Sequence, residues 1–166
     1  MTYKSDSSIQ QVNEAIAEYS QVISSKNNLS LLPSSIQNGF FQNKLLVIEL
    51  IQNGLPYTLF EKIKSIIPYT EEEWANYLNL SVKTLQRNKK EASFLFKPIH
   101  SEKIIELAEV AYFGHEIFDS ASKFYSWLSS NNYALGNHTP SNLLQNSYGK
   151  EMVMAELNRV DHGIFV

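Results

Sequence analysis

The chain has 166 residues, enough for one compact domain or for two small ones that share a core. With 43% hydrophobic and 19% charged residues it can bury such a core, which excludes a wholly disordered protein. There is no cysteine and the formal net charge is −3, so disulfides and thiolate chemistry are excluded and the overall charge does not favour binding to nucleic acid.

We expect neither a signal peptide nor a membrane-spanning segment in this sequence. Residues 1–6 are polar and lead into no apolar core of a signal peptide. The longest apolar run, residues 45–51, is interrupted by Glu49 and is too short to span a bilayer. We therefore expect a cytoplasmic protein with no membrane partner.

The N-terminal region is expected to be a helix followed by a linker, over residues 1–39. Apolar side chains at helical spacing indicate an amphipathic helix over residues 7–25, namely Ile9, Val12, Ile16, Tyr19 and Ile23. Residues 24–39 are rich in Ser and Asn and contain a proline and a glycine, which is typical of a loop. The apolar stripe has two interpretations, a helix for docking or dimerisation and a helix packed on its own domain.

From residue 44 onward the pattern predicts helix after helix, and hence an all-α fold. Residues 45–51 are expected to be helical up to the stop at Asn53 and Gly54, with Pro56 opening the next helix, over residues 58–67. Thr70 and Glu73 have the spacing of a capping box, in which each side chain bonds the other residue's backbone amide.

The next two segments predict a helix-turn-helix. A short helix containing Trp74 and Ala75 ends at Asn79, a residue type that enters the left-handed backbone region at low cost. Ser81 is a helix cap, so a second helix follows after a tight turn. Leu80 and Leu85 are expected to pack in the corner.

Basic residues are concentrated in this second helix. Residues 58–103 hold eight Lys/Arg against six acids, whereas residues 104–166 hold three against seven. Lys83, Arg87, Lys89 and Lys90 occur with no acid between them. Such a run is typical of a solvated helix face, but in a helix-turn-helix the second helix enters the major groove and its Lys and Arg contact phosphates.

The remaining chain is also expected to be helical. Ser101 is a possible cap for the first of these helices, and a second occupies residues 119–128. Thr139 and Pro140 have the pattern of a cap followed by proline at the first helical position. The last helix covers about residues 148–161 and ends at Gly163, which leaves three apolar residues at 164–166. These three either fold back onto the domain or reach into another molecule.

Motifs for catalysis or for cofactor and metal binding are absent from the sequence. There is no glycine-rich phosphate loop and no nucleophile elbow. The four histidines are scattered and lack the spacing of metal ligands. We therefore expect no enzyme, no cofactor and no metal.

The order of several short segments resembles the MbcA/ParS/Xre antitoxin family over about residues 45–166. These segments are Gly54-Leu55-Pro56, Leu80-Ser81-Val82-Lys83-Thr84-Leu85-Gln86-Arg87, Ser101-Glu102-Lys103, Trp127-Leu128, Leu135-Gly136, Thr139-Pro140, Leu143-Leu144, Gly149 and Leu157-Asn158-Arg159-Val160-Asp161-His162-Gly163. In three places asparagine stands where glycine is common, at Asn79, Asn137 and Asn158, and we expect asparagine to fit each turn.

The resemblance implies an all-α protein with an Xre-like helix-turn-helix domain, here residues 40–100, and a small helical toxin-binding domain, here residues 101–166. It implies a type II antitoxin that binds and neutralises a toxin of the RES-domain class, which consumes NAD or ADP-ribosylates a target. It further implies that the C-terminal end of the antitoxin occludes the toxin's active site. Many members also repress their own operon, so operator DNA is a second expected partner, and a homodimer or a larger hetero-oligomer with the toxin is expected.

Two sets of residues follow from this interpretation. The expected DNA-binding residues are Ser81, Lys83, Thr84, Gln86, Arg87 and Lys90. The expected toxin-binding residues are Arg159, His162, Gly163, Ile164, Phe165 and Val166. The alternative is a stand-alone helix-turn-helix repressor whose C-terminal domain serves only for dimerisation.

Overall fold

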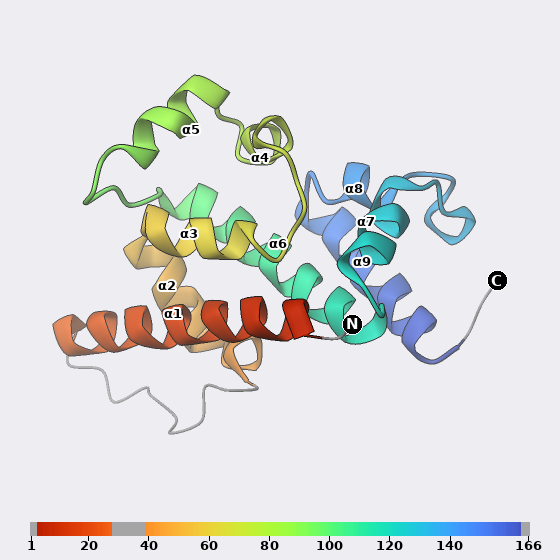
Figure 1. Cartoon of the computed structure of the whole chain (residues 1–166), viewed down its shortest axis with the longest axis horizontal. Helices are drawn as coiled ribbons and strands as arrows, with labels where there is room; N and C mark the ends of the chain where they lie inside the picture. Colours follow the sequence, from red (N-terminus) through yellow and green to blue (C-terminus); the bar gives the residue numbers. More distant parts are fainter. Residues whose placement is uncertain (1–2, 28–38, 164–166) are drawn as a thin grey trace.

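The computed structural model describes residues 3–27 and 39–163, and this part of the chain is built from helices (Figure 1). In chain order the helices are α1 (Tyr3–Asn27), the 3-10 turn η2 (Phe40–Gln42), α2 (Lys44–Asn53), α3 (Tyr57–Lys64), α4 (Glu71–Tyr77), α5 (Val82–Lys89), α6 (Pro98–Ile117), α7 (Ala121–Ser129), the 3-10 turn η3 (Tyr133–Leu135), α8 (Pro140–Leu143) and α9 (Ser147–Asp161). Within the described ranges there is no strand, which confirms the predicted all-α class. Among these helices none is both long and apolar enough to cross a bilayer.

The long helix α6 joins the two halves of the molecule. It packs against α2 and α3 on one side and against α7 and α9 on the other (Figure 1). Its buried face includes Ile104, Leu107, Ala108 and Ala111, which follow one another at helical spacing. Because α6 runs unbroken through residues 100 and 101, the two predicted domains share this helix, and their boundaries stay predictions.

Helix α1 packs on the helix-turn-helix half, along α3 and α2 (Figure 1). Val12, Ile16 and Ile23 are buried there, because the apolar stripe of α1 faces these helices. The Tyr19 hydroxyl donates a hydrogen bond to the carbonyl oxygen of Gly54 at 2.6 Å. Of the two interpretations of this stripe, packing on its own domain is the one observed.

Two of the predicted features at helix ends are confirmed, the capping box and the start of α8. The Thr70 hydroxyl accepts from the Glu73 amide while the Glu73 carboxylate accepts from the Thr70 amide, which is the predicted capping box. Thr139 caps α8, and Pro140 is its first residue. The first helical segment after Pro56 is shorter than predicted, since α3 ends at Lys64 and turns continue it to Ile67.

Two predictions at helix ends are wrong. Ser101 is no cap, because α6 begins at Pro98, whose ring fixes φ in the helical range, and Lys97 is its N-cap. Asn158 occupies no turn, because α9 continues to Asp161. By contrast Asn79 and Asn137 have φ of 51° and 63°, so asparagine does stand in for glycine at these two turns.

Candidate functional site

The corner of the helix-turn-helix is built around Ala75 and Asn79. The backbone amide of Leu80 donates to the carbonyl oxygen of Ala75 at 2.9 Å, which requires the chain to turn sharply at Asn79. Ala75 is buried and too small to hinder the close approach of the next helix. Leu85 is fully buried and Leu80 is half-buried against the same core, so α5 is held at a fixed orientation to α4.

Two of the predicted DNA-binding residues, Ser81 and Thr84, lie at the N-terminal end of α5. The Ser81 hydroxyl accepts a hydrogen bond from the Thr84 amide at 3.0 Å and lies 2.9 Å from the Thr84 hydroxyl. Both hydroxyls are therefore engaged with each other at the cap of α5.

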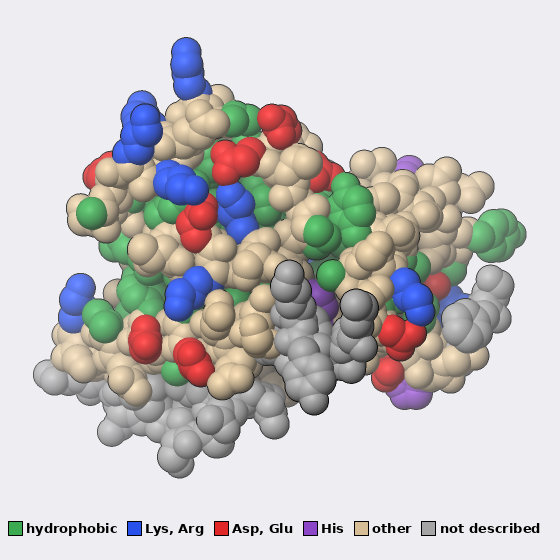
Figure 2. Space-filling view, viewed as in Figure 1, with side chains coloured by type: hydrophobic (Ala, Val, Ile, Leu, Met, Phe, Trp, Pro, Cys, Tyr) green, Lys and Arg blue, Asp and Glu red, His purple; other side chains and the backbone are tan. Residues whose placement is uncertain are grey.

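The other four predicted residues, Lys83, Gln86, Arg87 and Lys90, are exposed on one side of α5. In Figure 2 basic side chains gather over this helix, at the upper left of the view. Within the described part of the chain no ion pair engages Lys83, Arg87 or Lys90, whereas the Lys89 ammonium lies 3.3 Å from the Glu61 carboxylate on α3. The basic run is thus divided between three free cations and one that ties α5 to α3.

The C-terminal half is fixed to α6 by charged hydrogen bonds around the start of α9. The Lys103 ammonium donates to the Leu144 carbonyl at 3.1 Å and to Glu106 at 2.6 Å. The Ser147 hydroxyl donates to the same Glu106 carboxylate at 2.7 Å, and Lys150 pairs with Glu109. These contacts, together with burial of Val153 and Leu157, determine which side of α9 faces solvent.

The described members of the predicted toxin-binding set lie together at the end of α9. The Arg159 guanidinium lies 3.3 Å from Glu156, and the His162 ring donates from Nδ1 to the Asn158 carbonyl at 2.7 Å, where it closes the last turn. Gly163 is exposed and has φ of +69°, so the helix ends there. The remaining members, Ile164, Phe165 and Val166, lie outside the described residues.

The predicted DNA-binding residues and the described members of the toxin-binding set are far apart in the fold. Helix α5 lies at one end of the molecule and the C-terminal end of α9 at the other, with α6 between them (Figure 1). One chain can therefore present both surfaces at the same time.

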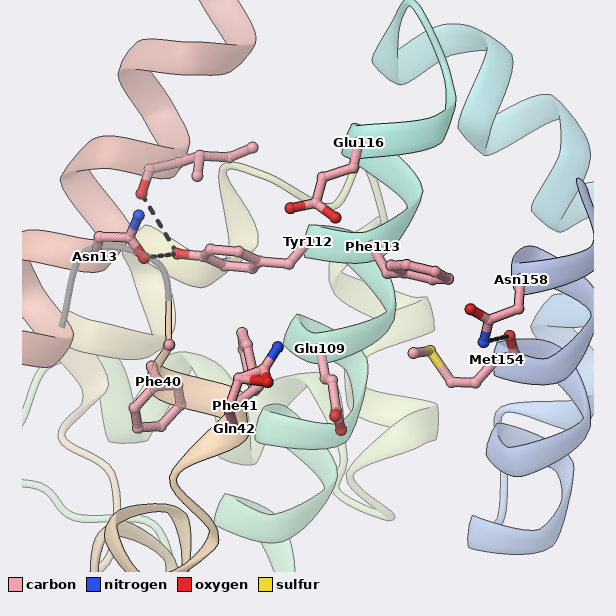
Figure 3. Close-up of a pocket in the computed structure, with 12 residues that line it drawn as sticks. Asn13, Phe40, Phe41, Gln42, Glu109, Tyr112, Phe113, Glu116, Met154 and Asn158 are labelled. Atoms are coloured by element: carbon pink, nitrogen blue, oxygen red, sulfur yellow. Dashed lines mark hydrogen bonds between the residues drawn. The ribbon is translucent and has the colours of Figure 1, made fainter. Parts of the chain in front are cut away.

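A pocket of about 370 Å³ that the sequence did not reveal lies between α1, η2, α6 and α9 (Figure 3). Phe41 and Tyr112 form an edge-to-face pair on its wall, and Glu109 and Glu116 add carboxylates. The Tyr112 hydroxyl donates to the Asn13 side-chain oxygen at 2.7 Å, and burial raises the Tyr112 pKa, so this hydroxyl remains a donor. No sequence signal could have found the pocket, because its lining comes from segments about a hundred residues apart.

Comparisons with known proteins match both halves of the chain. The antitoxin Xre-like helix-turn-helix domain matches residues 46–109, and the antitoxin Xre/MbcA/ParS C-terminal toxin-binding domain matches residues 114–163. Helix α1 precedes both matches. No curated protein matches the chain.

A solved structure supports the same fold. A chain in the crystal structure of the M. tuberculosis MbcT-MbcA toxin-antitoxin complex is similar, with a TM-score of 0.52 and 23% sequence identity. The match covers 64% of this chain and 94% of that chain. With the helix-turn-helix domain and the toxin-binding domain in this order on one chain, the protein belongs to the antitoxin Xre/MbcA/ParS family.

Proposed function

We propose that this antitoxin neutralises a RES-domain toxin, one that consumes NAD or ADP-ribosylates a target, by occluding the toxin's active site with residues 163–166. The observation that carries the proposal is the position of Gly163. The toxin-binding match extends to this residue, which is exposed and has a left-handed φ of 69°. The three residues that follow in the sequence are Ile164, Phe165 and Val166.

An apolar segment of this kind suits occlusion of an active site. Burying its side chains in a pocket contributes roughly 25 cal/mol per Å² of apolar surface, and no reaction by the antitoxin is needed. Occupancy of the site by the segment excludes NAD sterically. The antitoxin therefore acts by binding.

Deletion of residues 163–166 tests the proposal. A RES-domain protein that is encoded next to this chain and is toxic when expressed alone is the candidate partner. It is co-expressed with the full antitoxin or with the truncated one, and growth is measured. We expect the truncated protein to keep its helix content and melting temperature but to lose growth rescue. Full rescue by the truncated protein would contradict occlusion by this segment. Phe165→Ser provides a milder variant, with partial loss expected.

We also propose that α5 binds the operator of the antitoxin's own operon. The unpaired, exposed cations Lys83, Arg87 and Lys90 support this, because Lys and Arg contacts to phosphate provide much of the affinity of helix-turn-helix proteins. Such proteins bind two half-sites, so we expect a homodimer on DNA or a larger hetero-oligomer with toxin. Operator binding by a protein that leaves every toxin candidate unaffected would instead favour a stand-alone repressor.

A further inference from the structure

The pocket between α1, η2, α6 and α9 has the size and the lining of a small-molecule site (Figure 3). Its volume of about 370 Å³ lies in the range of such sites, which enclose a ligand in apolar and aromatic walls with a few polar groups. Figure 3 shows Tyr112 extending from α6 toward α1, and Phe113 extending toward α9. Phe41 from η2 and Met154 from α9 add to the apolar lining. The pocket therefore suits a ligand with an apolar or aromatic body.

One wall of the pocket is formed by α1, which precedes both family matches. Ile9 and Asn13 line the pocket from this helix. The Tyr112 hydroxyl donates to the Asn13 side-chain oxygen at 2.7 Å and lies 3.4 Å from the Ile9 carbonyl oxygen. This hydroxyl thus holds α1 against α6. The pocket depends on a part of the chain that neither matched domain includes.

The charged groups of the pocket favour a positive ligand. Glu109 and Glu116 lie on the same side of α6, and no Lys, Arg or His is among the described residues that line the pocket. Glu109 pairs with Lys44 on α2 and with Lys150 on α9. Glu116 is exposed, and in the part of the chain that the structure describes no ion pair engages it. The carboxylate of Glu116 is therefore the charge at this pocket that lacks a counter-ion.

An organic cation fits this combination of groups better than the alternatives. A positive group is attracted both by a carboxylate and by the faces of aromatic rings. Residues 28–38 contain no Lys, Arg or His, so this segment of the chain cannot supply the cation. Within residues 3–27 and 39–163 no three His, Asp or Glu side chains are grouped as a metal site requires. The aromatic lining also has no role in holding a bare metal ion.

We propose that this pocket binds a small organic cation, an amine or a guanidine that carries an apolar or aromatic body. Its charged group lies at Glu116, and its body lies against Tyr112, Phe113 and Met154. Such a ligand contacts α1, α6 and α9 at once, so its binding stabilises the attachment of α1 to the C-terminal half. This binding requires neither toxin nor operator, and it is therefore independent of the proposed function.

Three compounds that carry a phenyl ring on a two-carbon chain and differ in charge test the proposal. They are phenethylammonium, 2-phenylethanol and phenylacetate. The purified full chain, labelled with ¹³C at its methionine methyl groups, is titrated with each compound and followed by NMR. Met154 lines the pocket, whereas Met152 is 46% exposed and is not among the lining residues, so the Met152 signal is an internal control.

We expect phenethylammonium to shift the Met154 signal in a saturable way and to leave the Met152 signal in place. Its dissociation constant should be about fivefold or more below that of 2-phenylethanol, because only the ammonium pairs with the carboxylate. Phenylacetate should give no saturable shift, since its own carboxylate is repelled.

The role of Glu116 is tested with Glu116→Gln, which removes the charge and keeps the size of the side chain. We expect this variant to bind phenethylammonium about fivefold more weakly and to bind 2-phenylethanol as the parent protein does. Glu151→Gln is the matched control, since Glu151 is also an exposed glutamate but lies on α9 outside the pocket lining. It should bind all three compounds like the parent protein.

Several outcomes overturn the inference. Equal dissociation constants for phenethylammonium and 2-phenylethanol refute selection of a cation, as does an unchanged constant for Glu116→Gln. Equal weakening by Glu116→Gln and Glu151→Gln would show a general effect of net charge instead of a site. If none of the three compounds shifts the Met154 signal, or if the Met152 signal shifts in parallel with it, the pocket is not the binding site.

Discussion

The hydroxyl of Ser101, at 0% exposure in the first turns of α6, accepts a hydrogen bond from the backbone amide of Leu55 at 3.0 Å. The same hydroxyl donates to the carbonyl oxygen of Phe96 at 3.2 Å. The Phe96 amide in turn donates to the Leu55 carbonyl at 2.8 Å. One buried hydroxyl thus holds the α2–α3 connection against the segment that leads from α5 into α6.

We expect Ser101→Ala to destabilise the fold by about 1–3 kcal/mol, because it leaves the buried Leu55 amide without its acceptor. Urea unfolding followed by circular dichroism measures the change. Ser122→Ala, at an exposed position on α7, is the control and should leave the midpoint almost unchanged. Equal stability of the two variants would show that the hydroxyl is dispensable.

At the corner of the helix-turn-helix we expect Asn79→Ala to cost about 1–2 kcal/mol, since a Cβ without a polar side chain is disfavoured at φ of +51°. Asn79→Gly should be tolerated, because glycine adopts this conformation without steric cost. Thermal melts of the two variants give the comparison. Asn76→Ala, one turn earlier at an exposed helical position, is the control, and its melting temperature should equal that of the parent protein.

Gly149 is expected to be irreplaceable where α9 passes α8. A Cβ at this position would lie 1.8 Å from the carbonyl oxygen of Leu143, a backbone atom that cannot move aside alone. Gly149→Ala should therefore destabilise the C-terminal half by about 1–3 kcal/mol or more, as overpacking does. Hydrogen exchange in α8 and α9 measures this. In Gly39→Ala the new Cβ meets nothing within 4 Å, and exchange should be unchanged.

Operator binding should depend steeply on salt through the free cations of α5. We expect Lys83→Gln, and likewise Arg87→Gln or Lys90→Gln, to lower the slope of log affinity against log salt by about one unit. Fluorescence anisotropy with a promoter fragment over a range of NaCl concentrations measures this slope.

The controls for this titration follow from the ion pairs. Lys123 lies on α7, away from α5, and pairs with Asp119 at 2.7 Å, so Lys123→Gln should leave the slope unchanged. Lys89 is already bonded to Glu61, and we expect Lys89→Gln to alter the slope less than its neighbours do. Identical slopes for the parent protein and all α5 variants would remove α5 from the DNA interface.

Much of the fold could be predicted because its signals are local. The Thr70 capping box, the Ser81 and Thr139 caps and the left-handed Asn79 each depend on residues within about four positions of one another. Such interactions form in nearly the same way in any fold that contains the segment. The spacing of apolar residues likewise identified the buried face of α1, which contains Val12, Ile16 and Ile23.

The order of the helices, the caps at Thr70, Ser81 and Thr139 and the tight turn at Asn79 could be predicted from the amino-acid sequence, since each follows from neighbouring residues. Three outcomes depended on the tertiary structure. Ser101 accepts a hydrogen bond from Leu55 instead of capping α6, and Lys89 forms an ion pair with Glu61. Tyr148 and Met152 remain exposed to solvent. These outcomes depend on which distant segments meet, and helical periodicity is the same whether or not a partner helix covers a given face.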